Sequence, residues 1–561
     1  MTNSRRLPLS TKAFLVCGLW LIALGFYFIF LRPALLPEDP RYIGSSIEAI
    51  RAAVPGLERW LGHVFNVMGG FMVVSGVMTL LVVRRAFARH DRATFAGLLI
   101  AGVAGVTLMS ATNFLLHSDF RWELLLPALL WGAGIFCYLR EGMSGSLISV
   151  IQARGETRFF RDQAFHFQTL RVLNNICADG ADTAEVLETI GNIQERDTAS
   201  WFNAWEATGT RVLERASHIG DPRSRGLALL RAHNYLRTAE FFLLPSDSRR
   251  PVIFRRSVQA FEEGLDALGV ARERTRVPYG RDHLNAIFYP APPGIQAGPL
   301  FVLCGGFDST LEELYFVLVP AAHARGFSVL TFEGPGQGAV LREQKLTFTP
   351  EWELPTAAIL DAHFSVHPRQ TKTVLIGMSM GGYLASRAAA FDSRIDGVVA
   401  FDVLFDFGAV ARSTVPPLAL WLHARHARLL LNLLIAAKAR FSPGFAWSVA
   451  NGQWVLGTTS AMQTMQALDR YSLARVAGRI TADVLIMAGA DDHFIPVAQA
   501  ADFAGALKAA RSVRTIVYDR ESGGAEHCQM GAQSLWHADL FDWIASINEG
   551  SGDVQNPFNR R

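Results

Sequence analysis

The chain has 561 residues, which is too many for one domain, and half of these residues are hydrophobic. Its formal net charge is only +3, and it carries no basic stripe or nucleic-acid motif, which excludes nucleic acid as a partner. The five cysteines are scattered without metal-ligand or redox spacing, so we expect reduced thiols, no metal and no cofactor.

Apolar residues concentrate in residues 1–145, which we predict to be a membrane section. Four runs approach the length that a bilayer requires, at residues 13–31, 61–83, 96–116 and 122–139. The first run continues through bulky aromatic residues without a small-residue cleavage site, so we interpret it as a retained helix. Glycines that allow close helix packing are Gly69, Gly70, Gly76, Gly97, Gly102 and Gly105.

Basic residues predict the orientation of this section. They gather before the first run and in residues 84–92, and such segments stay on the cytoplasmic side of a membrane. Four spans return the chain to the side on which it began. We therefore expect a multi-pass protein of the inner or plasma membrane, with its amino terminus and catalytic domain in the cytoplasm. A periplasmic catalytic domain is the alternative, which would arise if one of the four spans did not insert.

Residues 150–270 alternate charged and apolar residues at helical spacing, which predicts a helical domain that packs on, or caps, the domain that follows. His233, Tyr235 and Glu240 lie in one of these helices and are candidates for lining a pocket. Structural hydrogen bonding is the simpler interpretation of each.

Residues 271–550 predict an α/β fold, because candidate strands alternate with helical patterns. The strands are expected at residues 274–277, 285–289, 300–304, 328–332, 373–376, 397–401, 484–487 and 514–518. The pair around Gly280 suits an antiparallel leading edge, and the rest suit a parallel, doubly wound sheet. Residues 551–561 are expected to be a flexible tail.

The fifth candidate strand leads into the turn Gly377-Met378-Ser379-Met380-Gly381, and an alanine-rich helical pattern follows. Strand, Gly-x-Ser-x-Gly turn and helix together form the nucleophile elbow of the α/β-hydrolases. The turn is expected to lift Ser379 above the sheet as a nucleophile.

The base and the acid are predicted from their positions after the last two strands. His527 lies in a glycine-containing loop after the final strand, where this fold carries its general base. Asp492 stands four residues before Pro496 and is preferred over Asp491 as the acid. His493 shares the acid's loop and is a poor competitor for the base.

The oxyanion hole is expected to use the backbone N–H of Met380 and one N–H from the loop after residues 300–304, at Phe307 or Gly306. Glu333 could contact substrate, although support of its own turn together with Gln337 is the preferred interpretation. Asp402 and Asp406 follow the strand after the elbow and are further wall residues that the sequence does not rank.

Several longer stretches resemble the dihydroxypseudooxynicotine hydrolase and fungal polyketide-shortening hydrolase family. They are SWFNAW, RAHNYLRTAEFFLL, GGFDSTLEELYF, TFEGPGQGAVLREQ, GMSMGGYLASRAAAF and GAEHCQ, within about residues 159–547. The resemblance implies an α/β-hydrolase core behind a helical amino-terminal domain, frequent homodimers, and cleavage of a carbon–carbon bond beside a ketone. Other relatives are ordinary esterases.

Two features depart from this family, namely the membrane section and a long apolar insertion expected to form a lid at about residues 405–480. The sequence therefore predicts a membrane-anchored serine hydrolase that cleaves a ketone-activated carbon–carbon bond or an ester in a small, largely apolar substrate. The alternatives are an esterase or thioesterase acting on membrane-derived acyl groups, and a noncatalytic sensing module.

Overall fold

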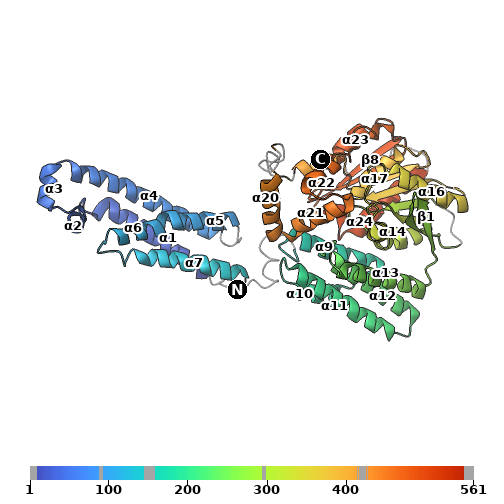
Figure 1. Ribbon diagram of the computed structural model, residues 1–561, viewed down its shortest axis with the longest axis horizontal. Coiled ribbons are helices and arrows are strands. Elements are labelled where there is room, and N and C mark those ends of the chain that lie inside the picture. The colour runs from blue at the N-terminus through green and yellow to red at the C-terminus, as the bar shows by residue number, and fades with distance from the viewer. Residues whose placement is uncertain are drawn as a thin grey trace. The chain divides into compact units, whose positions relative to one another are not determined.

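The computed structural model describes residues 9–86, 92–143, 158–293, 298–369, 371–413, 415, 425 and 428–548. The chain divides into two compact units, Met1–Arg158 and Phe159–Arg561, and each is described by itself (Figure 1). The first unit is helical throughout its described part. The second contains the sheet together with further helices.

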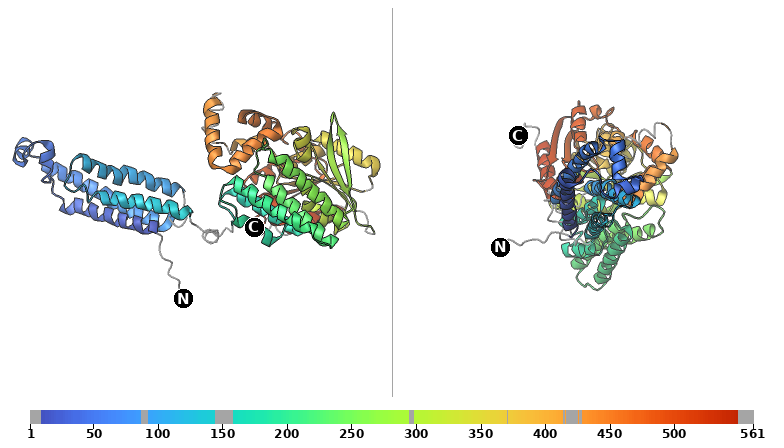
Figure 2. Two further views of the ribbon diagram at one scale, coloured as in Figure 1. Left: turned by 60° about the horizontal axis from the view of Figure 1, so that its bottom comes forward. Right: turned by 90° about the vertical axis from the view of Figure 1, so that its left-hand side faces the viewer.

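The helices of the first unit form an antiparallel bundle. They are α1 (Leu9–Phe26) with its continuation η1 (Tyr27–Leu31), α2 (Asp39–Ile43), α3 (Ile47–Ala53), α4 (Leu57–Ala86), α5 (Arg92–Ala101), η3 (Gly102–Thr107), α6 (Leu108–Leu115) and α7 (Leu125–Met143). Figure 2 shows that α1 begins and α7 ends at the same end of this bundle. The chain therefore leaves the unit at the end where it entered.

Three of the described helical stretches are long and apolar enough to cross a membrane, namely Ser10–Leu31, Leu57–Val83 and Ala96–Leu115. The prediction of four spans is corrected here. The apolar part of α7 is only Leu125–Tyr138, about 21 Å at 1.5 Å per residue, against about 30 Å of bilayer core. Residues 122–124, predicted to start this span, instead belong to a turn that follows Ser118 and Asp119, whose hydroxyl and N–H donate hydrogen bonds to Glu38.

Glycines bring α1 and α4 into backbone contact at two levels. A Cβ atom on Gly69 would lie 2.6 Å from the Gly25 carbonyl oxygen, and one on Gly76 would lie 2.6 Å from the Gly18 carbonyl oxygen. Gly102 meets the Trp131 ring in the same way. The close packing predicted for these three glycines is confirmed, whereas a Cβ atom on Gly70, Gly97 or Gly105 would meet no atom of another described element within 4 Å.

The second unit begins with helices, as predicted. They are α9 (Gln163–Asn174), η4 (Asn175–Ala178), α10 (Thr183–Gly191), α11 (Thr198–Ser217), α12 (Pro222–Glu240) and α13 (Arg249–Leu268). Aspartate side chains cap the first turns of α9, α10, α11 and α12 by accepting backbone N–H bonds. The helices bury Trp201, Trp205 and Tyr235 in a shared core.

An eight-stranded sheet forms the centre of the unit. Its strands are β1 (Glu273–Tyr279), β2 (Asp282–Tyr289), β3 (Leu300–Cys304), β4 (Val329–Glu333), β5 (Thr373–Met378), β6 (Gly397–Phe401), β7 (Asp483–Gly489) and β8 (Ser512–Tyr518). The order is β1-β2-β4-β3-β5-β6-β7-β8. The β1–β2 and β2–β4 pairs are antiparallel and the others parallel, so the predicted sheet and its antiparallel leading edge are confirmed.

Helices cover both faces of the sheet, and alternate residues of each strand serve the two layers. Phe301 and Leu303 of β3 face α14 (Glu313–His323) and α24 (Gln533–Asn548), whereas Val302 faces the other layer. That layer contains α15 (Gly338–Gln344), α16 (Glu353–Val366), α17 (Met380–Ala389) and α23 (Ala498–Ala506).

The segment between β6 and β7 is helical where it is described. It contains α18 (Phe407–Ser413), α20 (Arg428–Phe441), α21 (Pro443–Leu456) and α22 (Ala461–Leu468). These elements lie over the carboxyl ends of the strands, which is the edge at which open α/β sheets bind ligands.

Candidate active site

Ser379 occupies a sharp turn between β5 and α17. Its backbone has φ 58° and ψ −124°, a conformation that an L-residue adopts only under constraint. The two flanking glycines permit the bend, because a Cβ atom on Gly377 would collide with the Gly381 carbonyl group. The Ser379 N–H donates to the Phe401 carbonyl oxygen at 2.7 Å, which fixes the turn to β6.

His527 lies between Ser379 and Asp492. Its Nε2 is 2.9 Å from the Ser379 Oγ, and its Nδ1 is 2.6 Å from an Asp492 carboxylate oxygen. The Asp492 carboxylate is held in turn by the N–H groups of Phe494, at 2.7 Å, and Ile495, at 2.9 Å. A hydroxyl, an imidazole and an oriented carboxylate are the parts that nucleophilic serine catalysis needs.

Burial and charge act in opposite directions on this pair. Burial alone would lower the pKa of His527, but the adjacent Asp492 carboxylate raises that pKa well above its usual range. For Asp492, burial is outweighed by the imidazole charge and by hydrogen bonds, so its pKa is lowered. Asp492 is therefore ionised at neutral pH and stabilises the protonated imidazole.

Asp491 and His493, the competing candidates for the acid and the base, make other contacts. Asp491 forms an exposed ion pair with Arg520 and does not reach His527. The His493 ring packs against Phe167 and Phe494, with ring centroids 4.9 and 4.0 Å away.

The backbone N–H groups of Phe307 and Met380 have no hydrogen-bond acceptor among the described residues, and both residues line the cavity at Ser379. Met380 is the first residue of α17, where helix N–H groups lack intrahelical partners. The Gly306 N–H instead donates to the Ser309 hydroxyl at 2.9 Å. Of the two donors predicted for this loop, the geometry thus leaves Phe307 available.

A cavity of about 760 Å³ extends from Ser379 toward the helices between β6 and β7. Its wall is mainly apolar and includes Phe167, Phe241, Phe307, Leu434, Trp447 and Met465. Arg171 and Gln168 of α9 add polar groups. A cavity of this size suits a drug-sized apolar molecule that is oriented by a few polar contacts.

Comparison with known proteins connects this site to a family. Residues 300–533 match the alpha/beta hydrolase family model. Hydrolase acrC of Aspergillus aculeatus is 32% identical over 416 residues, covering 69% of this chain and 97% of that protein. This chain belongs to the α/β-hydrolase family.

Two further comparisons agree with the resemblance found in the sequence. The 20-hydroxy-prefusarin hydrolase FUS2 of Gibberella moniliformis is 31% identical to this α/β-hydrolase, covering 71% of this chain and 99% of that protein. A crystal structure of 2,6-dihydroxy-pseudo-oxynicotine hydrolase shares the fold, with a TM-score of 0.53 and 19% identity over 67% of this chain and 95% of that one. The predicted membership of that hydrolase family is confirmed.

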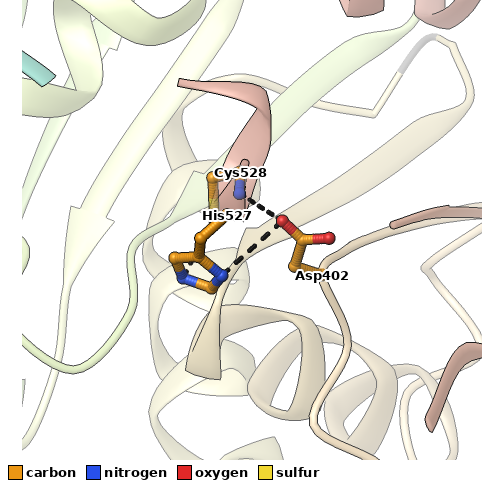
Figure 3. A group of neighbouring side chains, drawn as sticks. All are labelled: Asp402, His527 and Cys528. Carbon is orange, nitrogen blue, oxygen red and sulfur yellow. Dashed lines mark hydrogen bonds and ion pairs between the residues drawn. The ribbon is translucent and has the colours of Figure 1, made fainter. Parts of the chain in front are cut away.

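Asp402, directly after β6, supplies a second carboxylate beside His527, the candidate general base (Figure 3). One of its oxygens accepts the Gly489 N–H at 2.9 Å, and the other accepts the Cys528 N–H and lies 3.7 Å from the His527 Nδ1. Burial, and then the charge of Asp492, raise the pKa of Asp402 to about 7. The sequence placed Asp402 after a strand but gave no signal that it joins the acid and base loops.

Asp402, His527 and Cys528 are also the described group whose side chains lie close enough to share a metal ion. Their atoms already have other roles. Asp402 accepts two backbone N–H groups, and Asp492 occupies the His527 Nδ1. The Cys528 Sγ lies 3.6 Å from the His527 Nε2, and burial raises the pKa of its thiol to about 11. We therefore assign this group to the hydrolytic site.

Glu333 and Gln337 support the turn after β4, as the preferred interpretation expected. Glu333 accepts from the Asn285 amide at 2.7 Å and from the Ala339 N–H at 3.0 Å. The Gln337 side-chain amide donates to the Gly305 carbonyl oxygen at 2.6 Å, which braces the loop that carries Phe307. Burial, and then Glu312, raise the pKa of Glu333 to about 7.

The three candidates on α12 make structural contacts and do not line the 760 Å³ cavity. The Tyr235 hydroxyl donates to Glu185 at 2.7 Å, and the His233 Nδ1 lies 2.8 Å from the Ser257 carbonyl oxygen. Glu240 pairs with Arg250 and Arg342, at 2.8 and 2.7 Å.

Sequence reasoning missed Arg171, which joins α9 to the loop after β3. Its guanidinium pairs with Asp308 at 2.5 Å and with Glu313 at 2.5 Å, and Arg237 adds a contact to Glu313 at 2.8 Å. Because Asp308 follows Phe307 directly, the helical segment holds the loop that offers the Phe307 N–H. The charge pattern of α9 alone could not reveal partners 137 and 142 residues away.

Proposed function

We propose that this α/β-hydrolase is a membrane-anchored serine hydrolase in which Ser379 is the nucleophile, His527 the general base and Asp492 the acid. The observation that carries the proposal is the continuous chain of short contacts from the Ser379 Oγ through His527 to Asp492, at 2.9 and 2.6 Å. Ser379 and His527 line an apolar cavity, so the proposed nucleophile lies where a substrate has room to bind.

The geometry supports a two-step reaction. His527 accepts the Ser379 proton as the hydroxyl oxygen bonds to the substrate carbonyl carbon, and the Phe307 and Met380 N–H groups stabilise the resulting oxyanion. The bond to the leaving group then breaks, and His527 returns its proton to that group. Water, activated by His527, releases the acyl group from Ser379.

Cleavage of a carbon–carbon bond beside a ketone is the first candidate reaction. In that case the electron pair of the broken bond passes to the leaving carbon, where a neighbouring carbonyl stabilises it as an enolate before protonation. The family supports this chemistry, and one of the compared relatives is named as a hydrolase of 20-hydroxy-prefusarin.

Hydrolysis of esters or thioesters is the second candidate reaction. The same residues perform it, with an alcohol or thiol as the leaving group. Three apolar helices and an apolar cavity favour acyl groups taken from a membrane.

We further propose that the catalytic unit lies in the cytoplasm. The basic residues beside the first two apolar helices favour a cytoplasmic end of the bundle. Although its apolar part is shorter than the other three, α7 returns the chain to the end of the bundle at which α1 begins, so under this proposal the catalytic unit emerges on that side (Figure 2).

A fluorophosphonate probe tests the proposal directly, because it reacts with an activated serine whatever the natural substrate is. We expect stoichiometric labelling of Ser379 in the full chain, and none in Ser379→Ala, which should retain its fold. A wild-type protein that resists labelling would support the noncatalytic sensing module instead. Panels of β-diketones and activated esters, compared by product analysis, then separate the two reactions.

A further inference from the structure

The helix α20 projects from the catalytic unit beside α21 (Figures 1 and 2), and three of its leucines are exposed. Leu430, Leu433 and Leu434 are 50, 59 and 39% exposed, although large apolar side chains are usually buried. With Ala437 they recur at the spacing i, i+3, i+4 and i+7, which places them on one face of the helix.

The adjacent side of α20 forms part of the wall of the catalytic cavity, and Leu434 belongs to both sides. Ile435 is less exposed than the leucines and lines the cavity, together with Leu434 and Lys438 at the edges of the helix. The exposed leucine face of α20 therefore borders, through Leu434, the space that leads to Ser379.

All charged residues of α20 are basic. Arg428–Phe441 contains no acidic residue, and Lys438 and Arg440 are exposed near its end. An amphipathic helix with a leucine face and basic residues has the chemistry of an interfacial helix, which lies in the headgroup region with its apolar face in the acyl chains.

We propose that α20 rests on an anionic lipid bilayer, with Leu430, Leu433 and Leu434 in the acyl region, and that apolar substrates enter the cavity beside it directly from the lipid. This inference rests on the proposed function and adds that the substrate reaches the site from the lipid bilayer and not from water. The same chain carries three helices able to cross a membrane. The 15 residues between Met143 and Phe159 extend at most about 50 Å, so a bilayer that holds the first unit stays within reach of the catalytic unit.

The first test needs no substitution. The full chain is placed in nanodiscs of phosphatidylethanolamine and phosphatidylglycerol that contain a photoactivatable phosphatidylglycerol, and cross-linked peptides are mapped by mass spectrometry. Peptides of α20 should cross-link at least tenfold more than those of α16, which lies on the opposite side of the catalytic unit (Figure 1). Equal or absent cross-linking of α20 would overturn the proposal, whether or not Ser379 is an active nucleophile.

The second test uses Leu433→Glu and the matched control Leu354→Glu, since Leu354 on α16 is 57% exposed. We expect Leu433→Glu to slow labelling of Ser379 by a bilayer-dissolved hexadecyl fluorophosphonate about tenfold. Labelling by a short, water-soluble fluorophosphonate should stay within twofold, which also shows that the site is folded. Leu354→Glu should match the wild type with both probes.

Three results would count against this reading. Equal slowing with both probes would mean that Leu433 supports the site itself. A change of oligomeric state in Leu433→Glu would identify the leucine face as a contact between two copies of the chain. Failure of both probes on the wild type would remove the serine hydrolase function, while the cross-linking result would still decide where α20 lies.

Discussion

The carboxylate of Asp492 differs from that of Asp491 in one decisive contact, its 2.6 Å approach to the His527 Nδ1. Asp492→Asn keeps the shape of the side chain but removes the charge that orients and stabilises the imidazolium. We expect kcat to fall on the order of 10⁴-fold, as in other serine triads. Asp491→Asn, which loses only an exposed ion pair, should retain activity within twofold in the same ester assay.

Asp402 adds a negative charge near His527 as the pH rises through about 7, the pKa to which burial and Asp492 raise it. Asp402→Asn removes that charge and should lower the pKa of His527. Since His527 must be neutral to act as a base, the acid limb of the kcat/KM profile should move to lower pH by roughly one unit. A profile identical to that of Asp491→Asn would show that Asp402 acts only on structure.

The same pKa has a consequence for stability. The usual pKa of an aspartate is 3.8, so the buried Asp402 carboxyl stays protonated in the folded state while the unfolded chain ionises. Its contribution to the free energy of unfolding is therefore present below about pH 4 and is lost as the pH rises to about 7. Thermal unfolding of Asp402→Asn should depend less on pH across that window than unfolding of the wild type.

Residues of the site differ in how far the sequence predicts them. Ser379, Asp492 and His527 each follow a strand in a fixed chain order, so local pattern and order place them together. The choice between Gly306 and Phe307 depends on where the Ser309 hydroxyl points. The position of Asp402 depends on three loops meeting, and no spacing encodes that.

Among the elements, α9 couples to the oxyanion loop through Arg171. Arg171→Met leaves the buried Glu313 close to the half-buried Asp308, with Arg237 as the remaining cation paired to Glu313. We expect about 3–5 kcal/mol of destabilisation, together with a loss of kcat as the Phe307 N–H shifts. Arg256→Met breaks a pair with Glu206 in which both side chains are about one-third exposed, and it should cost at most about 1 kcal/mol. Denaturant unfolding and ester kinetics measure both effects.

The crossing of α1 and α4 offers a test with neighbouring glycines. Gly69→Ala brings a methyl group within 2.6 Å of the Gly25 carbonyl oxygen, so the helices must separate, at a cost of roughly 1–3 kcal/mol. Gly70→Ala meets open space and should be neutral or slightly stabilising. Thermal denaturation of the full chain in detergent compares them, and equal melting temperatures would contradict the observed crossing.

Elements were predicted well where periodicity was strong and poorly where tertiary contacts set their ends. All eight strands and the antiparallel first pair were predicted from apolar runs that alternate with helical patterns and from the turn signals between them. The run at residues 122–139 looked long enough for a bilayer, yet α7 begins only at Leu125. The bonds between Glu38 and the segment Ser118–Asp119, far apart in sequence, shape that turn.

At the scale of the whole molecule, the membrane section should decide where the enzyme is found. The full chain is expected to remain with membranes after an alkaline carbonate wash, because three apolar helices would have to leave the bilayer together. A reporter fused after residue 143 should be active only on the cytoplasmic side. An external signal would place the catalytic unit across the membrane from the proposed position.

The unequal apolar lengths within the bundle have a consequence for lipid preference. The apolar stretch of α4, Leu57–Val83, is about 40 Å long, whereas that of α7 is about 21 Å. In the proposed membrane-anchored protein, a bilayer matched to α4 is mismatched to the shorter α7, so tilt of α4 and local thinning beside α7 would share the difference. Such hydrophobic mismatch would sort this hydrolase toward thin or easily deformed membranes, where acyl chains are also most accessible to a cavity at the surface.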